Sequence, residues 1–298
     1  MYATVHLLMI NEAKYIDACC ISVSTYREYG NKEIEHVIMI DDSISEEGRK
    51  KLGKFFDKIY LIKLLKVKSD FNLRTEKLII RYGKWVDYAI NKWYILRLKD
   101  YKKVLFVDAD TLAVNDYSKV FEINTPAWVM FHKGYLKIDR LKKIIGEIPT
   151  GSILTKKMMK EISLNDDLCK EIGKINIPVN GSIVLVTPNE EDFRGIKRMV
   201  KQKLNKYGFY KILSYVSFPD ENILFEYYHC YIKKDINVLG PEYLTTLWEY
   251  QEGNLLFKNI KKPIILNFDS TDKPWLKKEK DLYPEERIWW DYRQKLKL

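Results

Sequence analysis

Two aspartates separated by one residue follow a short apolar run, and this is the strongest chemical signal in the chain. The run KKVLFV at residues 102–107 ends at Asp108-Ala109-Asp110. In an open α/β sheet, ligands bind at the carboxyl ends of the strands. Two carboxylates there repel each other unless a cation lies between them, and oxygen ligands suit Mg²⁺ or Mn²⁺ bound to substrate phosphates. The motif predicts a cation site that neutralises a leaving diphosphate; two solvated aspartates in a turn are the alternative.

Other kinds of catalytic site have no motif support. The chain has no P-loop, no G-x-G-x-x-G and no G-x-S-x-G segment, which removes the usual signals for kinases, dinucleotide enzymes and serine hydrolases. The histidines have no H-x-x-x-H spacing and the cysteines form no C-x-x-C pair, so we expect no zinc site and reduced structural thiols. These residues are His6, His36, His132 and His229, and Cys19, Cys20, Cys169 and Cys230.

The elements around the aspartates alternate between β-branched runs and longer amphipathic stretches. This alternation is typical of βαβ units, and it predicts an α/β fold with a mostly parallel central sheet. Strands are expected at 3–10, 35–40, 58–62, 102–107, 127–131, 181–186 and 263–268. Helices are expected at 13–29, 45–56, 82–96, 190–207, 219–228 and 284–298. We expect Trp275, Trp289 and Trp290 to pack the C-terminal helix against the core.

The chain has 298 residues, of which 46% are hydrophobic, so it can bury a large core. With no repeat or clear linker, we expect one domain, residues 1–298. Within it we expect a nucleotide-binding half at 1–131, an inserted basic segment or acceptor loop at 132–178, and an acceptor half with the C-terminal helix at 179–298.

The net charge of +10 favours an anionic partner, such as a phosphorylated small molecule, a nucleic acid or a membrane surface. The lysines and arginines are spread along the chain without a recognisable nucleic-acid-binding pattern, so we expect no nucleic acid partner. No apolar run is long enough for a transmembrane segment, and the N-terminus lacks the features of a signal peptide. The expected location is cytoplasmic.

The segment INKWYILRLKDYKKVLFVDADTLAVND, residues 90–116, resembles a characteristic segment of family 8 glycosyltransferases, the group of glycogenin and galactinol synthase. Similar segments follow the family's order and together cover most of the chain. They are Asn11-Glu12-Ala13 with Tyr15, VNGS at 179–182, PDEN at 219–222, NFDSTDKPW at 267–275 and RIWWDYRQKL at 287–296.

For the nucleotide, the resemblance implies a GT-A, Rossmann-like fold that binds a UDP-sugar. Tyr15 would stack on the uracil through its flat ring, and Asn11 would lie beside the same nucleotide. Lys273 would bind the β-phosphate as a point charge. Ser270 stands where the family generally has Gly, at the place where the backbone approaches the diphosphate.

For the metal, the resemblance implies a Mn²⁺ or Mg²⁺ site made by Asp108, Asp110 and Asn267, with Asp108 also binding the ribose. The family usually has a ligating His at the position of Asn267. Asn offers only a carbonyl oxygen, a ligand that suits a hard cation and shifts the expected preference from Mn²⁺ towards Mg²⁺ or weakens binding.

For the sugar, the resemblance implies that Lys92 lies on the sugar-phosphate side and that Asn180 and Asp220 bind donor hydroxyls. Glu221 stands where glycogenin has Gln and adds a carboxylate near the sugar. Asp220 and Glu221 are the candidate nucleophiles for a reaction with retention of configuration; we favour attack on the same face of the sugar, guided by the leaving phosphate.

The predicted function is a metal-dependent, retaining hexosyltransferase. It would move glucose or galactose from a UDP-sugar to a hydroxyl of a saccharide, polyol or protein, in the manner of glycogenin. A homodimer is compatible with this function. The alternatives are a catalytically weakened protein that binds nucleotide sugar without turnover, and a basic nucleic-acid-binding protein.

Overall fold

The computed structural model describes residues 1–71, 76–130, 148–159, 177, 179–213, 217–246, 263–268 and 273–298. The chain forms two compact units, each made of segments that are distant in the sequence. Unit 1 contains Met1–Lys63, Tyr101–Phe121 and Glu242–Leu298. Unit 2 contains Leu64–Asp100 and Glu122–Pro241. Most of the expected insertion at 132–178 lies outside the described residues, and the predicted domain division stays a prediction.

Unit 1 contains four parallel strands in the order β3-β2-β1-β4. They are β1 (Tyr2–Leu8), β2 (Ile34–Ile40), β3 (Lys58–Leu61) and β4 (Lys103–Val107). Val5 in β1 pairs with Val37 on one side and with Phe106 on the other, and all three are buried. The α/β fold class and these four strands are as the sequence predicts, because continuous apolar runs suit strands that are covered on both faces.

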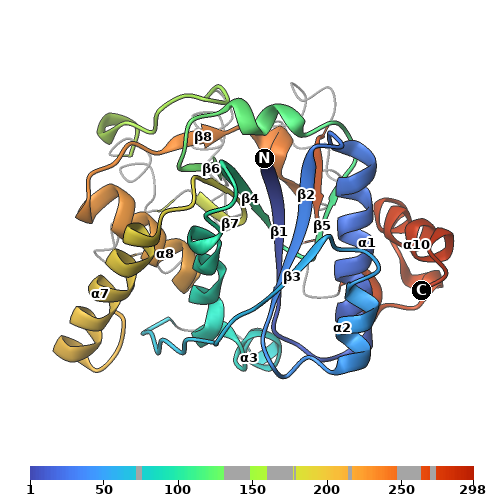
Figure 1. Ribbon diagram of the computed structural model, residues 1–298. Coiled ribbons are helices and arrows are strands. Elements are labelled where there is room, and N and C mark those ends of the chain that lie inside the picture. Colours follow the sequence, from blue (N-terminus) through green and yellow to red (C-terminus); the bar gives the residue numbers. More distant parts are fainter. Residues whose placement is uncertain are drawn as a thin grey trace. The chain divides into compact units, whose positions relative to one another are not determined.

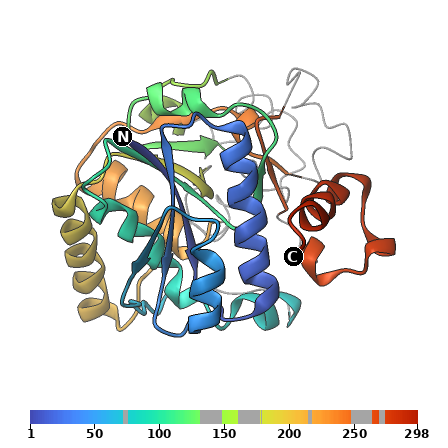
Figure 2. The same ribbon diagram turned by 45° about the vertical axis from the view of Figure 1, so that its right-hand side comes forward.

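The described residues of unit 1 include the helices α1 (Ala13–Tyr29), α2 (Glu46–Leu52) and α10 (Pro284–Lys295). Figure 1 shows α1 and α2 side by side next to the strands, and Figure 2 shows α10 beside α1. Trp289 of α10 is buried with Ala18 and Ile21 of α1, and Trp275 and Trp290 pack against the same cluster. The expected packing of the C-terminal helix through its tryptophans is therefore confirmed.

Unit 1 also holds a small three-stranded sheet in the order β5-β10-β9. Its strands are β5 (Thr111–Ala113), β9 (Thr245–Thr246) and β10 (Ile265–Asn267). β10 is antiparallel to β5 and parallel to β9. The sequence predicts only the strand that contains β10, because segments of two or three residues show no period. β5 begins directly after Asp110, so this sheet fixes the path of the chain leaving the aspartates.

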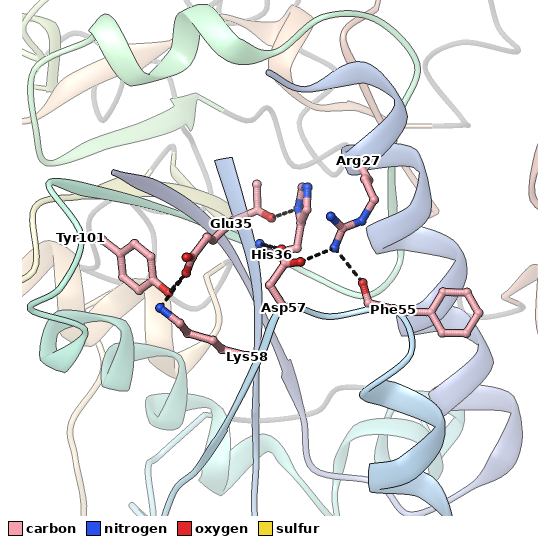
Figure 3. A network of polar contacts seen from close by, with 8 residues as sticks. Arg27, Glu35, His36, Phe55, Asp57, Lys58 and Tyr101 are labelled. Carbon is pink, nitrogen blue, oxygen red and sulfur yellow. Dashed lines mark hydrogen bonds and ion pairs between the residues drawn. The ribbon is translucent and has the colours of Figure 1, made fainter. Parts of the chain in front are cut away.

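A polar network ties β2 to its neighbours in unit 1 (Figure 3). The backbone N–H of His36 donates to Asp57 Oδ2 at 2.7 Å, and Arg27 of α1 donates to Asp57 Oδ1 at 3.0 Å. Tyr101 donates to Glu35 at 2.6 Å. Burial, with Arg27 nearby, lowers the pKa of His36 to about 4, so this ring is neutral at pH 7. The polar groups of this network bind one another, so we assign it a structural role that holds β2 against its neighbours.

Unit 2 contains three strands in the order β7-β6-β8. They are β6 (Ala127–Met130), β7 (Val179–Val186) and β8 (Asn237–Leu239), with β6 antiparallel to β7 and parallel to β8. Its helices include α3 (Glu76–Tyr82), α7 (Glu190–Tyr207) and α8 (Pro219–Phe225). Asn189 caps α7 through the N–H groups of Glu191 and Asp192. Gly208 ends the helix at φ 76°, a left-handed conformation that favours glycine.

Two helices of unit 2 differ from the expected α-helices. The predicted helix at 82–96 is a 3₁₀ helix at Val86–Arg97, in which the Asn91 side chain donates to the carbonyl of Tyr88 at 2.6 Å. The predicted helix at 219–228 is α8 followed by a π-helical turn, Glu226–Tyr231. In that turn the hydroxyls of Tyr227 and Tyr228 both bind the Asp192 carboxylate, at 3.1 and 3.0 Å. Side-chain hydrogen bonds of this kind leave no mark on hydrophobic spacing.

Short 3₁₀ turns also lie at Ser118–Glu122, Pro241–Tyr243, Pro274–Leu276 and Glu279–Asp281. Cys19, Cys20 and Cys230 are free thiols, whereas Cys169 lies outside the described residues. Within the described ranges, every helix is too short or too polar to cross a membrane.

Candidate active site

The Asp-Ala-Asp motif forms a tight turn at the carboxyl end of β4. The N–H of Thr111 donates to the carbonyl of Asp108 at 3.1 Å, and the Thr111 hydroxyl donates to the same oxygen at 2.7 Å. Both aspartates are half-buried. The sequence therefore placed this motif correctly, at the edge of the sheet where ligands of open α/β folds bind.

Asn267 lies directly across from this turn. It pairs with Thr111 in the β10–β5 ladder, and the N–H of Phe268 donates to the carbonyl of Asp110 at 2.9 Å. Asn267 is 2% exposed. Two backbone strands thus hold the predicted third ligand beside the aspartates.

Lys273 reaches the same aspartates from the segment that follows β10. Its Nζ lies 2.5 Å from Asp110 Oδ2 and 2.5 Å from the carbonyl oxygen of Phe268. The Lys273 side chain is 10% exposed. The lysine that the resemblance assigns to the β-phosphate is therefore paired with a predicted metal ligand. Ser270 lies outside the described residues.

The oxygens gathered here fit a divalent cation. Asp110 Oδ1 is buried and accepts no hydrogen bond from any described residue, an arrangement that costs free energy unless something binds there. Carboxylate and amide oxygens are the ligands of hard cations, which keep other positions for water and phosphate. In the described part of the chain, no three His, Cys, Asp or Glu side chains are grouped to hold a metal. The oxygens of Asp108, Asp110 and Asn267 are therefore of the kind that suits a hard cation.

Helix α1 fixes the turn through buried polar side chains that the sequence analysis missed. Ser22 donates to the carbonyl of Thr111 at 2.6 Å, and the Tyr26 hydroxyl lies 2.9 Å from the Thr111 hydroxyl. His6 Nε2 lies 2.9 Å from the Ser22 hydroxyl. Burial lowers the pKa of His6 to about 3, which keeps the ring neutral. Ser22 and Tyr26 stand one helical turn apart, and polar residues on the buried face of a helix are the signal that could have revealed them.

Tyr15, predicted to stack on the base, lies in the first turn of α1, and Asn11, predicted to lie beside the nucleotide, precedes this helix. Tyr15 is half-buried and meets Trp275 edge to face, with ring centroids 5.9 Å apart. Tyr15 and Ala109 pack against the same apolar cluster, so the ring and the Asp-Ala-Asp turn share one support. Asn11 is exposed, and its side-chain oxygen accepts a hydrogen bond from the N–H of Ser45 at 3.1 Å.

Unit 2 gathers the four predicted catalytic residues around the start of β7. Glu221 Oε1 accepts the N–H of Gly181 at 2.9 Å, and its Oε2 accepts the N–H of Phe218 at 2.8 Å. Asn180 Oδ1 accepts the N–H of Ser182 at 2.7 Å. Oε1 of the buried Glu221 carboxylate thus joins α8 to β7, whereas Oε2 caps the start of α8 itself.

Lys92, from the 3₁₀ helix, completes this cluster. Its Nζ lies 3.1 Å from Asp220 Oδ2 and donates to the carbonyl of Gly181 at 3.2 Å. Asp220 is 2% exposed. A Cβ on Gly181 would lie 2.6 Å from Asp220 Oδ2, so only glycine allows the carboxylate to approach this strand. The sequence predicts these residues from three separate motifs, and the structure brings them together.

Comparison with known proteins gave relatives of two kinds, while no family model matches the chain. An uncharacterized protein of Acanthamoeba polyphaga mimivirus, R707, is 23% identical over 269 residues, covering 88% of this chain and 79% of that protein. Glycogenin of Komagataella phaffii is 28% identical over 119 residues, covering 39% of this chain and 28% of that protein.

Solved structures resemble the chain over almost its whole length. The galactosyltransferase LgtC, solved with donor and acceptor sugar analogues, matches with a TM-score of 0.59 at 13% identity. The match covers 98% of this chain and 95% of the LgtC chain. The glycosyltransferase GlyE of Streptococcus pneumoniae has a TM-score of 0.57 at 15% identity; the match covers 97% of this chain but spans only 59% of the GlyE chain. The chain has the GT-A fold of these proteins, and the predicted resemblance to family 8 glycosyltransferases is confirmed.

Proposed function

We propose that this protein is a glycosyltransferase that moves a hexose from a UDP-sugar to a hydroxyl acceptor, with the help of a divalent cation and with retention of configuration. The observation that carries the proposal is the arrangement in unit 1. There, Asp108, Asp110, Asn267 and Lys273 meet at the carboxyl end of β4. The GT-A fold, shared with known glycosyltransferases, supports it.

We assign binding of the nucleotide diphosphate to unit 1. Asp108, Asp110 and Asn267 would hold Mn²⁺ or Mg²⁺, which when bound offsets the negative charge that develops on the leaving UDP. Lys273 would offer a second positive charge to the β-phosphate. Positive charge held where negative charge develops is a large source of rate enhancement. Tyr15 offers the flat ring that stacks on the base.

The contacts in unit 2 favour attack by the acceptor on the same face of the sugar, and not attack by a carboxylate of the enzyme. The Glu221 carboxylate accepts two backbone hydrogen bonds, which lower the nucleophilicity of its oxygens. Asp220 is paired with Lys92 and is almost fully buried. The resemblance assigns Asn180 and Asp220 to donor hydroxyls, and a carboxylate held this firmly suits a hydrogen-bonding role.

The proposed activity can be tested without a known acceptor, because glycosyltransferases of this kind can pass the sugar to water. The assay measures UDP release from UDP-glucose, UDP-galactose and other UDP-sugars with Mn²⁺, with Mg²⁺ or with a chelator. We expect release that needs the metal, favours one hexose donor and is lost in Asp110→Asn. Binding of UDP without release from any donor, even with candidate acceptors, would instead support a nucleotide-sugar-binding protein. No UDP binding at all would contradict both.

A further inference from the structure

The lysine at the aspartate turn is bound to a carboxylate that the sequence assigns to the cation. Lys273 Nζ is 2.5 Å from Asp110 Oδ2 and 2.5 Å from the carbonyl oxygen of Phe268, so it is surrounded by oxygens as a small cation would be. The side chains of Lys273 and Asp110 are only 10% and 20% exposed. An ion pair with so little solvent is weakly screened and must be broken or strained before another cation binds Asp110.

The second oxygen of Asp110 does not offer a way around this conflict. A metal on Oδ1, which is buried and accepts no hydrogen bond from the described residues, would share one carboxylate with the lysine on Oδ2. Two positive charges on opposite oxygens of a carboxylate lie within a few ångströms of each other and repel. Binding at either oxygen therefore favours a lysine that has moved away.

We propose that Lys273 is an internal counter-ion that competes with the divalent cation for Asp110 and gives way when the diphosphate of the donor binds. The proposal rests on the function proposed above. A diphosphate is a stronger anionic partner for an ammonium group than one shared carboxylate. Its arrival moves the lysine from Asp110 to phosphate and leaves Asp110 to the metal. Metal and nucleotide thus bind with positive coupling, which must be the same in both directions.

Substitution of Lys273 should change metal affinity in the opposite direction from substitution of a residue that binds the metal. Removing the positive charge of Lys273 improves the binding of metal alone, because the ammonium group that pairs with Asp110 is then gone. The same change weakens the coupling between metal and UDP. A residue that only supported the fold around the site would reduce metal affinity when it was removed.

The test is calorimetric titration of Mn²⁺ into the full chain, with and without saturating UDP, after correction for Mn²⁺ bound by UDP in solution. In the absence of UDP, we expect Lys273→Met to bind Mn²⁺ about tenfold more tightly than wild type, or more. Lys273→Gln, which keeps a donor for the Phe268 carbonyl, is the second neutral variant in case the first does not fold. Lys273→Arg keeps the charge and should bind like wild type.

Lys277→Met is the matched control, because Lys277 pairs with the buried Glu286 in the same unit but not with the aspartates. Its Mn²⁺ affinity should equal that of wild type, and UDP should raise the affinity of wild type more than that of Lys273→Met. Equal or weaker Mn²⁺ binding in both neutral variants overturns the competition while leaving the proposed function standing. Absence of Mn²⁺ binding in every variant, with or without UDP, overturns the metal-dependent function as well.

Discussion

Asp110 in unit 1 and Asp220 in unit 2 are both paired with a lysine, but their surroundings differ. Asp110 is 20% exposed at its side chain and has a buried oxygen that accepts no hydrogen bond from the described residues. Asp220 is 3% exposed and stands beside Glu221, whose two oxygens both accept backbone N–H groups. A carboxylate oxygen that accepts no hydrogen bond from the described residues suits a ligand, whereas the contacts of the unit 2 cluster join α8 to β7.

The largest expected effect is that of Asp110→Asn on turnover. The change removes a negative charge from the proposed cation site, and we expect metal-dependent UDP release to fall by about 10²–10³-fold, the range found when one transition-state contact is removed. The free energy of unfolding in urea should fall by less than about 2 kcal/mol, because Asn still offers an oxygen to Lys273, which also donates to the carbonyl of Phe268.

Asp281→Asn is the control, since Asp281 is an exposed carboxylate of the same unit. Its turnover and stability should match those of wild type. If the Asp110→Asn protein folds and still releases UDP at the wild-type rate, Asp110 is not needed for the cation, and the contrast drawn between Asp110 and Asp220 is wrong.

Asp220→Asn should show its main effect on stability. It removes the buried charge of Asp220 and leaves Lys92, whose side chain is 15% exposed, without its charged partner, a change that typically costs about 3 kcal/mol or more. Urea unfolding measures this loss, and the double variant Asp220→Asn with Lys92→Met should recover part of it, because neither charge is then left alone. A loss below about 1 kcal/mol in the free energy of unfolding would show that the ion pair between Asp220 and Lys92 contributes little to the stability of unit 2.

Glu221→Gln separates a nucleophile from a positioning residue. Gln keeps one acceptor oxygen and turns a donor towards an N–H group, so we expect a loss of about 1–2 kcal/mol in the free energy of unfolding. Turnover should fall by less than about tenfold, in contrast with the loss of an essential nucleophile. The exposed Glu191 of the same unit provides the control, Glu191→Gln. A sugar adduct found on Glu221 by mass spectrometry would contradict the assignment.

The smallest expected effect concerns the support of the aspartate turn. Tyr26→Phe removes the hydroxyl beside Thr111 and should cost about 1 kcal/mol of stability. Tyr117→Phe removes a comparable hydrogen bond, from the Tyr117 hydroxyl to the carbonyl of Tyr26. If α1 positions the metal ligands, only Tyr26→Phe should weaken Mn²⁺ binding. Equal Mn²⁺ affinity in the two variants would show that Tyr26 contributes to stability and does not position the metal ligands.

The sequence predicts best what depends on local runs of residues. The four parallel strands of unit 1 follow from continuous apolar stretches, and the place of Asp108 and Asp110 follows from the end of one of them. The pairing of β5 with β10 does not follow, because each strand has three residues and the two are distant in the sequence. That pairing is what brings Asn267 to the aspartates.

The resemblance predicted site residues that spacing alone could not relate. Lys92, Gly181 and Asp220 come from three motifs, and their contact depends on a carboxylate that approaches a glycine in a neighbouring strand. The resemblance did not predict that Lys273 pairs with Asp110, since a family motif describes residues that bind ligand and not what they contact in its absence. The roles that the resemblance implies for all of the site residues, Asn11 and Ser270 among them, stay predictions.

The most direct test of the account is UDP binding to wild type and to Asp110→Asn, measured by calorimetry with and without Mn²⁺. The account predicts that Mn²⁺ strengthens UDP binding to wild type by about tenfold or more and leaves the binding to Asp110→Asn almost unchanged. Equal strengthening in both proteins would contradict the claim that the aspartate turn of unit 1 joins metal and nucleotide.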